Sequence, residues 1–496
     1  MSSGAKGATT PQTPALEAPS HPRAGSLAAR TIHASAWTGL GFGARQLVRF
    51  ASNVLLARLL FPEMFGLMAL VSTIVQGIEL FSDIGVSGSI VQNRRGDDPD
   101  FLNTAWTLQV VRGVLLWAAV SAAAYPVSQF YGQPALAVLM PVVGIGSLID
   151  GFRSTALATR RRHLHIARVV VQDLVAQSAG VAVMLAWAWT SPTVWALVAG
   201  GLVGALVRML LSHTLEPEQR NRFHFDRACA RELYAFGRWI FVSTALTYLA
   251  NQSDRLLLGK LVPLATLGVY QIGMNLATLA TSSVLQVGSV VAFPAYSRVH
   301  QRGDPLAPTF RRVRLLLQLG GAIVVGTILC LGPALVALLY DARYADAGWM
   351  VRYVACGVWF QILAVTIGSG LMAVGTPRSV ASSNFVKLVG IAAGIPLGYS
   401  LAGMPGALLG LIASDVAKYL TMAWMGQRRG FASFGTDALL TAWLGLAVLA
   451  ALAVGHAAAS RGLGPLPCAL AEGAVFALGW LPWIPTARRA FRGGLR

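Results

Sequence analysis

The stretch LLLQLGGAIVVGTILCL, from Leu315 to Leu331, contains no charged residue. Similar apolar blocks recur along the chain of 496 residues, of which 55% are hydrophobic and only 12% charged. Soluble domains carry roughly 25% charged residues. A helix of about 20 apolar residues spans about 30 Å of hydrocarbon. The sequence therefore predicts an all-α, polytopic membrane protein.

The apolar blocks predict about fourteen transmembrane helices. Their centres lie near residues 47, 73, 116, 146, 178, 204, 249, 278, 322, 360, 390, 415, 447 and 475. Basic residues provide an independent check, because cytoplasmic loops are enriched in Lys and Arg. The two tails and the even-numbered connections hold roughly 26 basic residues, whereas the odd-numbered connections hold only Lys260, Arg343 and Arg461. This asymmetry predicts that both termini are cytoplasmic and that the outer connections are short.

Several other classes of protein do not fit the sequence. The formal net charge of +19 follows the cytoplasmic connections and does not gather on a soluble domain, so no nucleic acid partner is expected. The four cysteines have no metal-ligand spacing, so neither a metal site nor a disulfide framework is expected. The outer connections are too short and too poor in His and carboxylates for a polysaccharide polymerase or ligase. An enzyme is therefore the least favoured class.

The chain contains a weak internal repeat six helices apart. When Pro62 is set over Pro263, three leucine pairs align, and Gly66 matches Gly268 after one inserted residue. An even number of crossings makes the two halves parallel repeats about an axis along the membrane normal. We therefore expect a disordered tail at 1–30, a six-helix bundle at 31–214, a cytoplasmic linker at 215–235, a second bundle at 236–428, accessory helices at 435–486 and a basic tail at 487–496.

Four stretches resemble a known transporter family. They are LLARLLFPEMFGLMAL in the first half, TSPTVWALVAGGLVGALVRMLL in the sixth helix, FGRWIFVSTALTYLANQSDRLLLGKLVPLATLGVYQIGMNLATLATS with VVAFPAYSRV, and the GTPRS turn. The chain is similar over roughly residues 33–430 to the polysaccharide exporters (Wzx-type flippases). These belong to the multidrug, oligosaccharidyl-lipid and polysaccharide flippase (MOP) superfamily.

The resemblance implies alternating-access export of undecaprenyl-diphosphate-linked polysaccharide repeat units, destined for lipopolysaccharide, capsule or exopolysaccharide, across the bacterial inner (plasma) membrane. Polysaccharide polymerase and glycosyltransferase machinery are the protein partners that this role implies. An exporter of the same superfamily with another cargo, either the peptidoglycan lipid precursor or cationic drugs, is the alternative. An excess of central cations argues against cationic drugs.

Two arginines stand inside the first apolar helix. Arg45, Arg49 and Asn53 follow i, i+4, i+8 spacing and share one stripe. A charge near the bilayer centre is costly and usually faces a watery cavity or a partner. Guanidinium groups bind phosphate oxygens in bidentate fashion. The stripe therefore favours a diphosphate site, and the competing interpretation is an ion pair with an acidic residue such as Glu79.

Other charged residues within the predicted spans extend this cationic interior. Arg112, Lys387 and Lys418 are further candidates for binding the cargo. Asp415 lies three residues before Lys418, so the two side chains can neutralise each other on one helix face. Lys387 has no local partner, and a snorkelling lysine is its alternative interpretation.

Four charged residues within the predicted spans are candidates for ion coupling or for gating: Glu79, Asp254, Arg255 and Asp415. Asp254 and Arg255 are adjacent, so they cannot pair as helix neighbours do. A carboxylate there could bind a coupling proton or sodium ion, or join an inter-helix salt bridge. No other cofactor is expected. The run Arg160 to Arg162, with two histidines, is expected to contact anionic membrane lipids.

Overall fold

The computed structural model describes residues 24–80, 85–214, 221–287, 292–431 and 434–492. The first half contains eight helices: α1 (Ala24–Leu59), α2 (Pro62–Leu80), α3 (Val86–Gln92), α4 (Pro99–Tyr131), α5 (Ala135–Gly151), α6 (Ala156–Arg162), α7 (Ile166–Thr190) and α8 (Val194–Ser212). The second half contains α9 (Arg227–Leu261), α10 (Leu264–Val287), α11 (Phe293–Gln301), α12 (Leu306–Leu339), the 3-10 turn η2 (Ala342–Tyr344), α13 (Ala347–Ala373) and α14 (Pro377–Arg428). The C-terminal elements are α15 (Phe434–Ser460), α16 (Pro465–Gly479), the 3-10 turn η3 (Leu481–Trp483) and α17 (Ile484–Arg492).

The described residues form no strand, and the protein is an all-helical, multi-pass membrane protein. Among these residues, nine helices are long and apolar enough to cross a membrane, and the bent pair α5 and α6 adds a tenth. Helices α1, α9 and α10, which carry the polar groups of the site described below, are not among the nine. Each of the fourteen predicted centres falls within a helix. The count of fourteen spans and the side on which the termini lie remain predictions.

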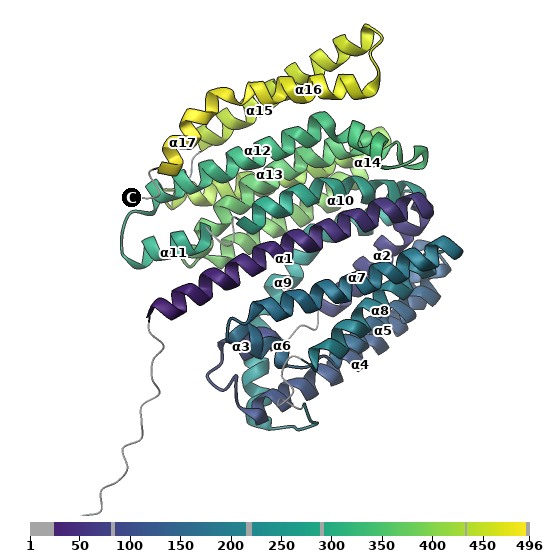
Figure 1. Ribbon diagram of the computed structural model, residues 1–496, viewed down its shortest axis with the longest axis vertical. Coiled ribbons are helices and arrows are strands. Elements are labelled where there is room, and N and C mark those ends of the chain that lie inside the picture. Colours follow the sequence, from purple (N-terminus) through teal and green to yellow (C-terminus); the bar gives the residue numbers. More distant parts are fainter. Residues whose placement is uncertain (1–23, 81–84, 215–220, 288–291, 432–433, 493–496) are drawn as a thin grey trace, which may run out of the picture.

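The helices stack roughly side by side, and α1 crosses between the two halves (Figure 1). In the first half α4 packs on α5 and α7 packs on α8; in the second half α13 packs on α12 and α14. The helices α15 and α16 lie beyond α12, at the top of Figure 1. Helix α1 begins at Ala24, inside the expected tail, and α9 begins at Arg227, inside the expected linker.

Helix α14 is a hairpin. Non-helical backbone at Ala402 and Gly403 separates its two arms, and Gly403 has φ 61°, a conformation that favours glycine. A Cβ on Gly410 would lie 2.1 Å from the carbonyl oxygen of Gly394. The arms can approach this closely because glycine lacks a side chain. This packing supports the short connection that the sequence predicts between helices eleven and twelve.

The two halves meet where α2 packs against α10. A Cβ on Gly66 would lie 2.0 Å from the carbonyl oxygen of Leu264, and a Cβ on Gly268 would lie 1.8 Å from that of Pro62. The contact is thus reciprocal and joins the two glycines that the internal repeat aligns. We call this contact the glycine seam. We call the end of the molecule that carries the α1–α2 and α9–α10 turns the outer end, following the orientation that the sequence predicts.

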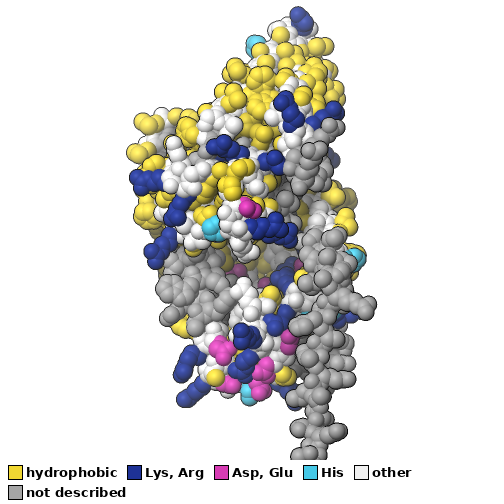
Figure 2. Space-filling model, turned by 90° about the vertical axis from the view of Figure 1, so that its left-hand side faces the viewer, with side chains coloured by type: hydrophobic (Ala, Val, Ile, Leu, Met, Phe, Trp, Pro, Cys, Tyr) yellow, Lys and Arg dark blue, Asp and Glu magenta, His cyan; other side chains and the backbone are white. Residues whose placement is uncertain are grey.

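The opposite end carries α3, α6 and α11 and faces the viewer in Figure 2. Many Lys and Arg side chains appear on this face, and the acidic side chains gather on its lower part. Arg162, which belongs to the run expected to contact anionic lipids, is instead bound within the protein. Its Nε donates to Asp97 at 2.9 Å, and its Nη1 donates to the backbone oxygens of Ile90, Val91 and Asn93. Arg162 therefore ties α6 to the segment after α3.

Candidate functional site

A cavity of about 690 Å³ lies between the two halves. Helices α1, α2, α5, α7 and α8 line it from the first half, and α9 and α10 line it from the second. We call it the central cavity. Its polar lining comprises Arg49, Ser52, Asn53, Ser72, Thr73, Gln76, Glu79, Ser147, Asp150, Gln177, Arg208, Gln252, Arg255, Gln271 and Asn275. A cavity with this lining can hold a polar, anionic molecule inside the membrane.

Arg49 and Arg255 supply charge to this cavity from opposite halves, and the two charges repel each other. Among the described residues, the guanidinium of Arg49 forms no hydrogen bond or ion pair. Arg255 donates from Nε to the amide oxygen of Gln271 at 2.8 Å. Its two terminal nitrogens have no hydrogen-bond acceptor in the described part of the chain. Two arginines that repel each other form a site that an anion would stabilise.

Arg45 does not line the central cavity, although it shares a helix stripe with Arg49. Its Nη1 lies 3.3 Å from Oδ2 of Asp173 on α7. Arg208 approaches the same carboxylate from α8, with Nε 3.7 Å from Oδ1. The structure therefore places Arg45 in an ion pair, but its partner is Asp173 and not Glu79. Arg208 itself lines the central cavity.

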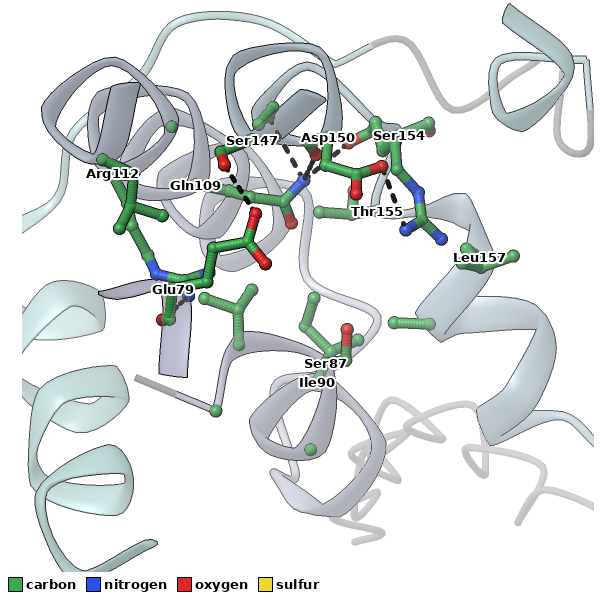
Figure 3. A pocket seen from close by; sticks show the side chains of 18 of the residues that line it. Glu79, Ser87, Ile90, Gln109, Arg112, Ser147, Asp150, Ser154, Thr155 and Leu157 are labelled. Atoms are coloured by element: carbon green, nitrogen blue, oxygen red, sulfur yellow. Dashed lines mark hydrogen bonds and ion pairs between the residues drawn. The ribbon is translucent and has the colours of Figure 1, made fainter. Parts of the chain in front are cut away.

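Glu79 and Arg112 lie beside a second hollow, of about 410 Å³, which we call the side pocket (Figure 3). Oε1 of Glu79 accepts a hydrogen bond from Ser147 at 2.5 Å, and Nη2 of Arg112 donates to the backbone oxygen of Glu79 at 2.7 Å. Glu79 also lines the central cavity. The structure thus brings these two predicted residues together at the junction of the two spaces.

Four of the predicted residues of the second half line a third cavity, of about 680 Å³: Asp254, Arg255, Lys387 and Lys418. Nζ of Lys387 lies 2.7 Å from Oδ1 of Asp415, and both side chains are almost fully buried. The amide of Gln361 donates to the other carboxylate oxygen at 3.0 Å. Lys418 is also buried, and within the described part of the chain its ammonium has no ion-pair partner.

This arrangement corrects the pairing that sequence spacing suggests. The partner of Asp415 is Lys387, on the other arm of the α14 hairpin, and not Lys418 one turn away on its own arm. A tertiary contact thus replaces the i, i+3 contact, because the carboxylate faces across the hairpin.

Asp254 and Arg255 point in different directions, as adjacent helix residues do. The hydroxyl of Tyr270 donates to Oδ2 of Asp254 at 2.5 Å, and both side chains are buried. The second oxygen of Asp254 has no hydrogen-bond partner among the described residues. Both Asp254 and Arg255 line the third cavity, and Arg255 also lines the central one. Arg255 thus links the central cavity to the third cavity, which Asp254 lines.

Two tyrosines close the outer end. The hydroxyl of Tyr131, at the end of α4, donates to the backbone oxygen of Leu256 at 3.3 Å. The hydroxyl of Tyr344, in η2, donates to that of Leu60 at 3.0 Å. Tyr131 therefore binds α9 of the second half, and Tyr344 binds the residue that follows α1 of the first half. Together with the glycine seam they hold the halves together beyond the central cavity.

An exposed pair braces this closure. Arg343 donates to the carboxylate of Asp341 from Nε at 2.9 Å and to the backbone oxygen of Arg58 from Nη2 at 3.1 Å. The hydrogen bond from Arg343 holds the pKa of the Asp341 carboxyl below its usual value. The brace thus reaches from the second half to the end of α1.

Sequence reasoning missed the polar groups of the side pocket. Gln109, Asp150 and Arg153 line it, but no spacing rule singles out a pocket assembled from α4, α5 and the segment after α5. It also missed the ion pair between Arg314 and Asp437, with Nη2 2.8 Å from Oδ2 and both side chains 1% exposed. The sequence alone suggests that Arg314 lies in a loop between two membrane helices, because Arg311 and Arg312 precede it. Within the described residues, no group of three or more His, Cys, Asp or Glu side chains could hold a metal ion.

A family model described as "Polysaccharide biosynthesis protein" matches residues 55–348, more than half of the chain. The chain belongs to this polysaccharide biosynthesis family. The match begins in α1 and runs to the start of α13, and so it includes both turns that form the glycine seam.

One relative in this family is the lipopolysaccharide biosynthesis protein WzxC of Escherichia coli K12. It is 21% identical over 420 residues, which cover 84% of this chain and 85% of WzxC. The resemblance to Wzx-type polysaccharide exporters is thereby confirmed. This member of the polysaccharide biosynthesis family is a membrane transporter and not an enzyme.

Two solved structures share the fold. The lipid II flippase MurJ in an inward closed conformation superposes with a TM-score of 0.71 at 10% identity, covering 91% of this chain and 99% of MurJ. An inward-facing multidrug resistance MATE family transporter of the MOP superfamily superposes with a TM-score of 0.64 at 13% identity, covering 80% of this chain and 95% of the transporter. At these identities the likeness shows the fold alone.

Proposed function

We propose that the protein is a flippase that moves undecaprenyl-diphosphate-linked polysaccharide repeat units across the bacterial inner membrane. Membership of the polysaccharide biosynthesis family supports a cargo of this class. The observation that carries the proposal is the pair Arg49 and Arg255 in the central cavity, one from each half. Paired guanidinium groups suit a diphosphate because each can offer two parallel donors to its oxygens.

The translocation proceeds by alternating access. The glycine seam and the two tyrosine hydrogen bonds close the outer end, which corresponds to a state that loads from the predicted cytoplasmic side. Cargo bound between Arg49 and Arg255 then draws the halves together on the cytoplasmic side. Since a ligand shifts an equilibrium only through its differential affinity, a site shared by both halves is suited to this role.

A coupling proton or sodium ion is the expected source of energy. The buried carboxylates Asp254 and Asp415 support this part of the proposal, because Asp254 lines the third cavity beside Arg255 and Asp415 contacts Lys387 and Gln361 of its lining. Asp254 keeps one oxygen without a hydrogen-bond partner among the described residues. A cation bound there would neutralise it, since an unpaired buried charge is costly. Anionic lipids, a polymerase and glycosyltransferases are the remaining proposed partners.

Another anionic lipid precursor, that of peptidoglycan, is the second candidate cargo. The cationic lining of the central cavity favours it as much as the first, whereas it disfavours cationic drugs. The two lipid cargoes differ in their sugars and share the diphosphate. They are separated by which lipid intermediate accumulates when the transporter is deleted.

The experiment uses a deletion strain that lacks surface polysaccharide, complemented with Arg49→Gln, Arg255→Gln and the double variant. We expect the double variant to lose export by about tenfold or more, because a hydrogen bond to a charged group contributes roughly 1.5–3 kcal/mol. Arg168→Gln is the matched control, since Arg168 is an exposed arginine outside the three cavities. Full export by a double variant that is inserted normally into the membrane would overturn the diphosphate role.

A further inference from the structure

The side pocket adjoins the central cavity. Glu79, Ser147 and Asp150 line both spaces, so a molecule held in one can reach the other past these three side chains. Helices α3 and α6 close the far side of the pocket, on the predicted cytoplasmic part of the first half. A ligand with two chemically distinct parts could therefore occupy both spaces at once.

The side pocket shares the acids Glu79 and Asp150 with the larger central cavity, and most of its other polar groups are its own: Gln109, Ser154, Thr155, Arg112, Arg153 and Arg161. Glu79 lies beside Gln109 and Asp150, and Ser87 and Ile90 of α3 lie below them (Figure 3). Arg153 places Nη1 3.4 Å from Asp150, while its buried Nε has no hydrogen-bond partner among the described residues. Donors and acceptors thus alternate around one space.

This alternation selects a class of ligand. A hydroxyl group both donates to a carboxylate and accepts from a guanidinium or hydroxyl group, so it can pair with both kinds of group in this lining. The volume of about 410 Å³ lies within the range of ordinary ligand pockets, about 300–1,000 Å³. A hydroxyl-rich sugar residue matches both the chemistry and the size.

We propose that the side pocket binds a sugar residue of the lipid-linked cargo while the diphosphate lies between Arg49 and Arg255. This inference rests on the proposed function and adds a determinant of cargo choice to it. A site whose buried polar groups must be paired rejects ligands that lack the matching hydroxyls. Recognition of the sugar thus falls to the first half, through α2, α4, α5, α3 and α6.

Binding to the purified full-length protein in detergent tests the inference. The probes are farnesyl diphosphate and its conjugates with glucose, galactose and N-acetylglucosamine, and native mass spectrometry gives the dissociation constants. Ser87→Leu fills the pocket from an exposed position on α3, and Arg161→Leu removes a donor from its lining. Arg168→Leu is the matched control for Arg161, because it removes an exposed arginine outside the pocket.

We expect at least one glycosylated probe to bind the unmodified protein about tenfold more tightly than farnesyl diphosphate, a gain that corresponds to one or two hydrogen bonds. Both pocket variants should lose this gain and keep their affinity for farnesyl diphosphate, and the control should keep both. The inference is overturned if no conjugate binds more tightly than farnesyl diphosphate, or if the pocket variants retain the gain. Failure of the unmodified protein to bind farnesyl diphosphate overturns the proposed function and this inference together.

Discussion

The glycine seam makes a sharp prediction for Gly268→Ala. The added Cβ would lie 1.8 Å from the carbonyl oxygen of Pro62, whereas real contacts of this kind do not fall below 3.0 Å. Helices α2 and α10 must then separate by about 1.2 Å, the difference between those distances. Overpacking of this kind costs about 1–3 kcal/mol. Only the closed outer end carries this cost, so the ratio of closed to open molecules should fall by roughly 5- to 150-fold.

The assay is pulsed electron paramagnetic resonance on spin labels at Ala135 and Ala345, exposed residues at the outer ends of the two halves, in a background without the native cysteines. Gly268→Ala should move the distance distribution towards longer separations. Gly320→Ala is the control, because it adds the same methyl group to a helix where a Cβ meets nothing within 4 Å. Its equal gain in helix propensity does not depend on which end is open. An unchanged distribution in Gly268→Ala would show that the seam does not hold the outer end closed.

Three further predictions concern charged groups. Asp437→Leu should lower the free energy of unfolding by about 3–5 kcal/mol, because it leaves Arg314 buried without its carboxylate; thermal unfolding in detergent measures this, and the double change with Arg314→Met should recover most of it. Lys387→Leu should destabilise the protein similarly, and adding Asp415→Leu should restore stability but not transport; restored transport would remove Asp415 from the coupling role. The pKa of the Asp341 carboxyl is lower in the folded protein than its ordinary value of 3.8, so its ionised form stabilises the fold at a pH above 3.8. This stabilisation is lost as the pH falls through the lowered pKa. Asp341→Asn should therefore remove this contribution from the pH dependence of the free energy of unfolding.

The sequence predicts the membrane helices well because their hydrophobicity is local. Each predicted centre lies in a helix, and the aligned Gly66 and Gly268 meet in space. The charge partners are harder to predict. Arg45 and Arg49 share a stripe, but α1 crosses between the halves, so that one arginine meets α7 and the other meets the cavity. The position of each arginine along the helix axis decides which partner it meets. The helical period of the sequence shows which residues share a face, but not what each residue meets along the axis.

Partners that are distant in the sequence have no local signal at all. Arg314 and Asp437 are brought together by α12 and α15, and each alone resembles an ordinary helix-end charge. The side pocket is assembled from five helices, and none of them carries a motif. For such features the decisive information is the packing of the helices, which a single sequence specifies only through the whole fold.

The reciprocal contact at the glycine seam has the symmetry of an interface between two identical subunits. Gly66 meets the start of α10 and Gly268 meets the start of α2, which is the arrangement that two identical chains adopt around a twofold axis. The present chain therefore has the form of a fused homodimer. Elsewhere the two halves differ: the first half holds the side pocket, and the second half holds the buried Lys387–Asp415 pair. At their shared contact the halves are bound to each other's geometry, because a larger residue at either glycine would force the backbone of the opposite half to move.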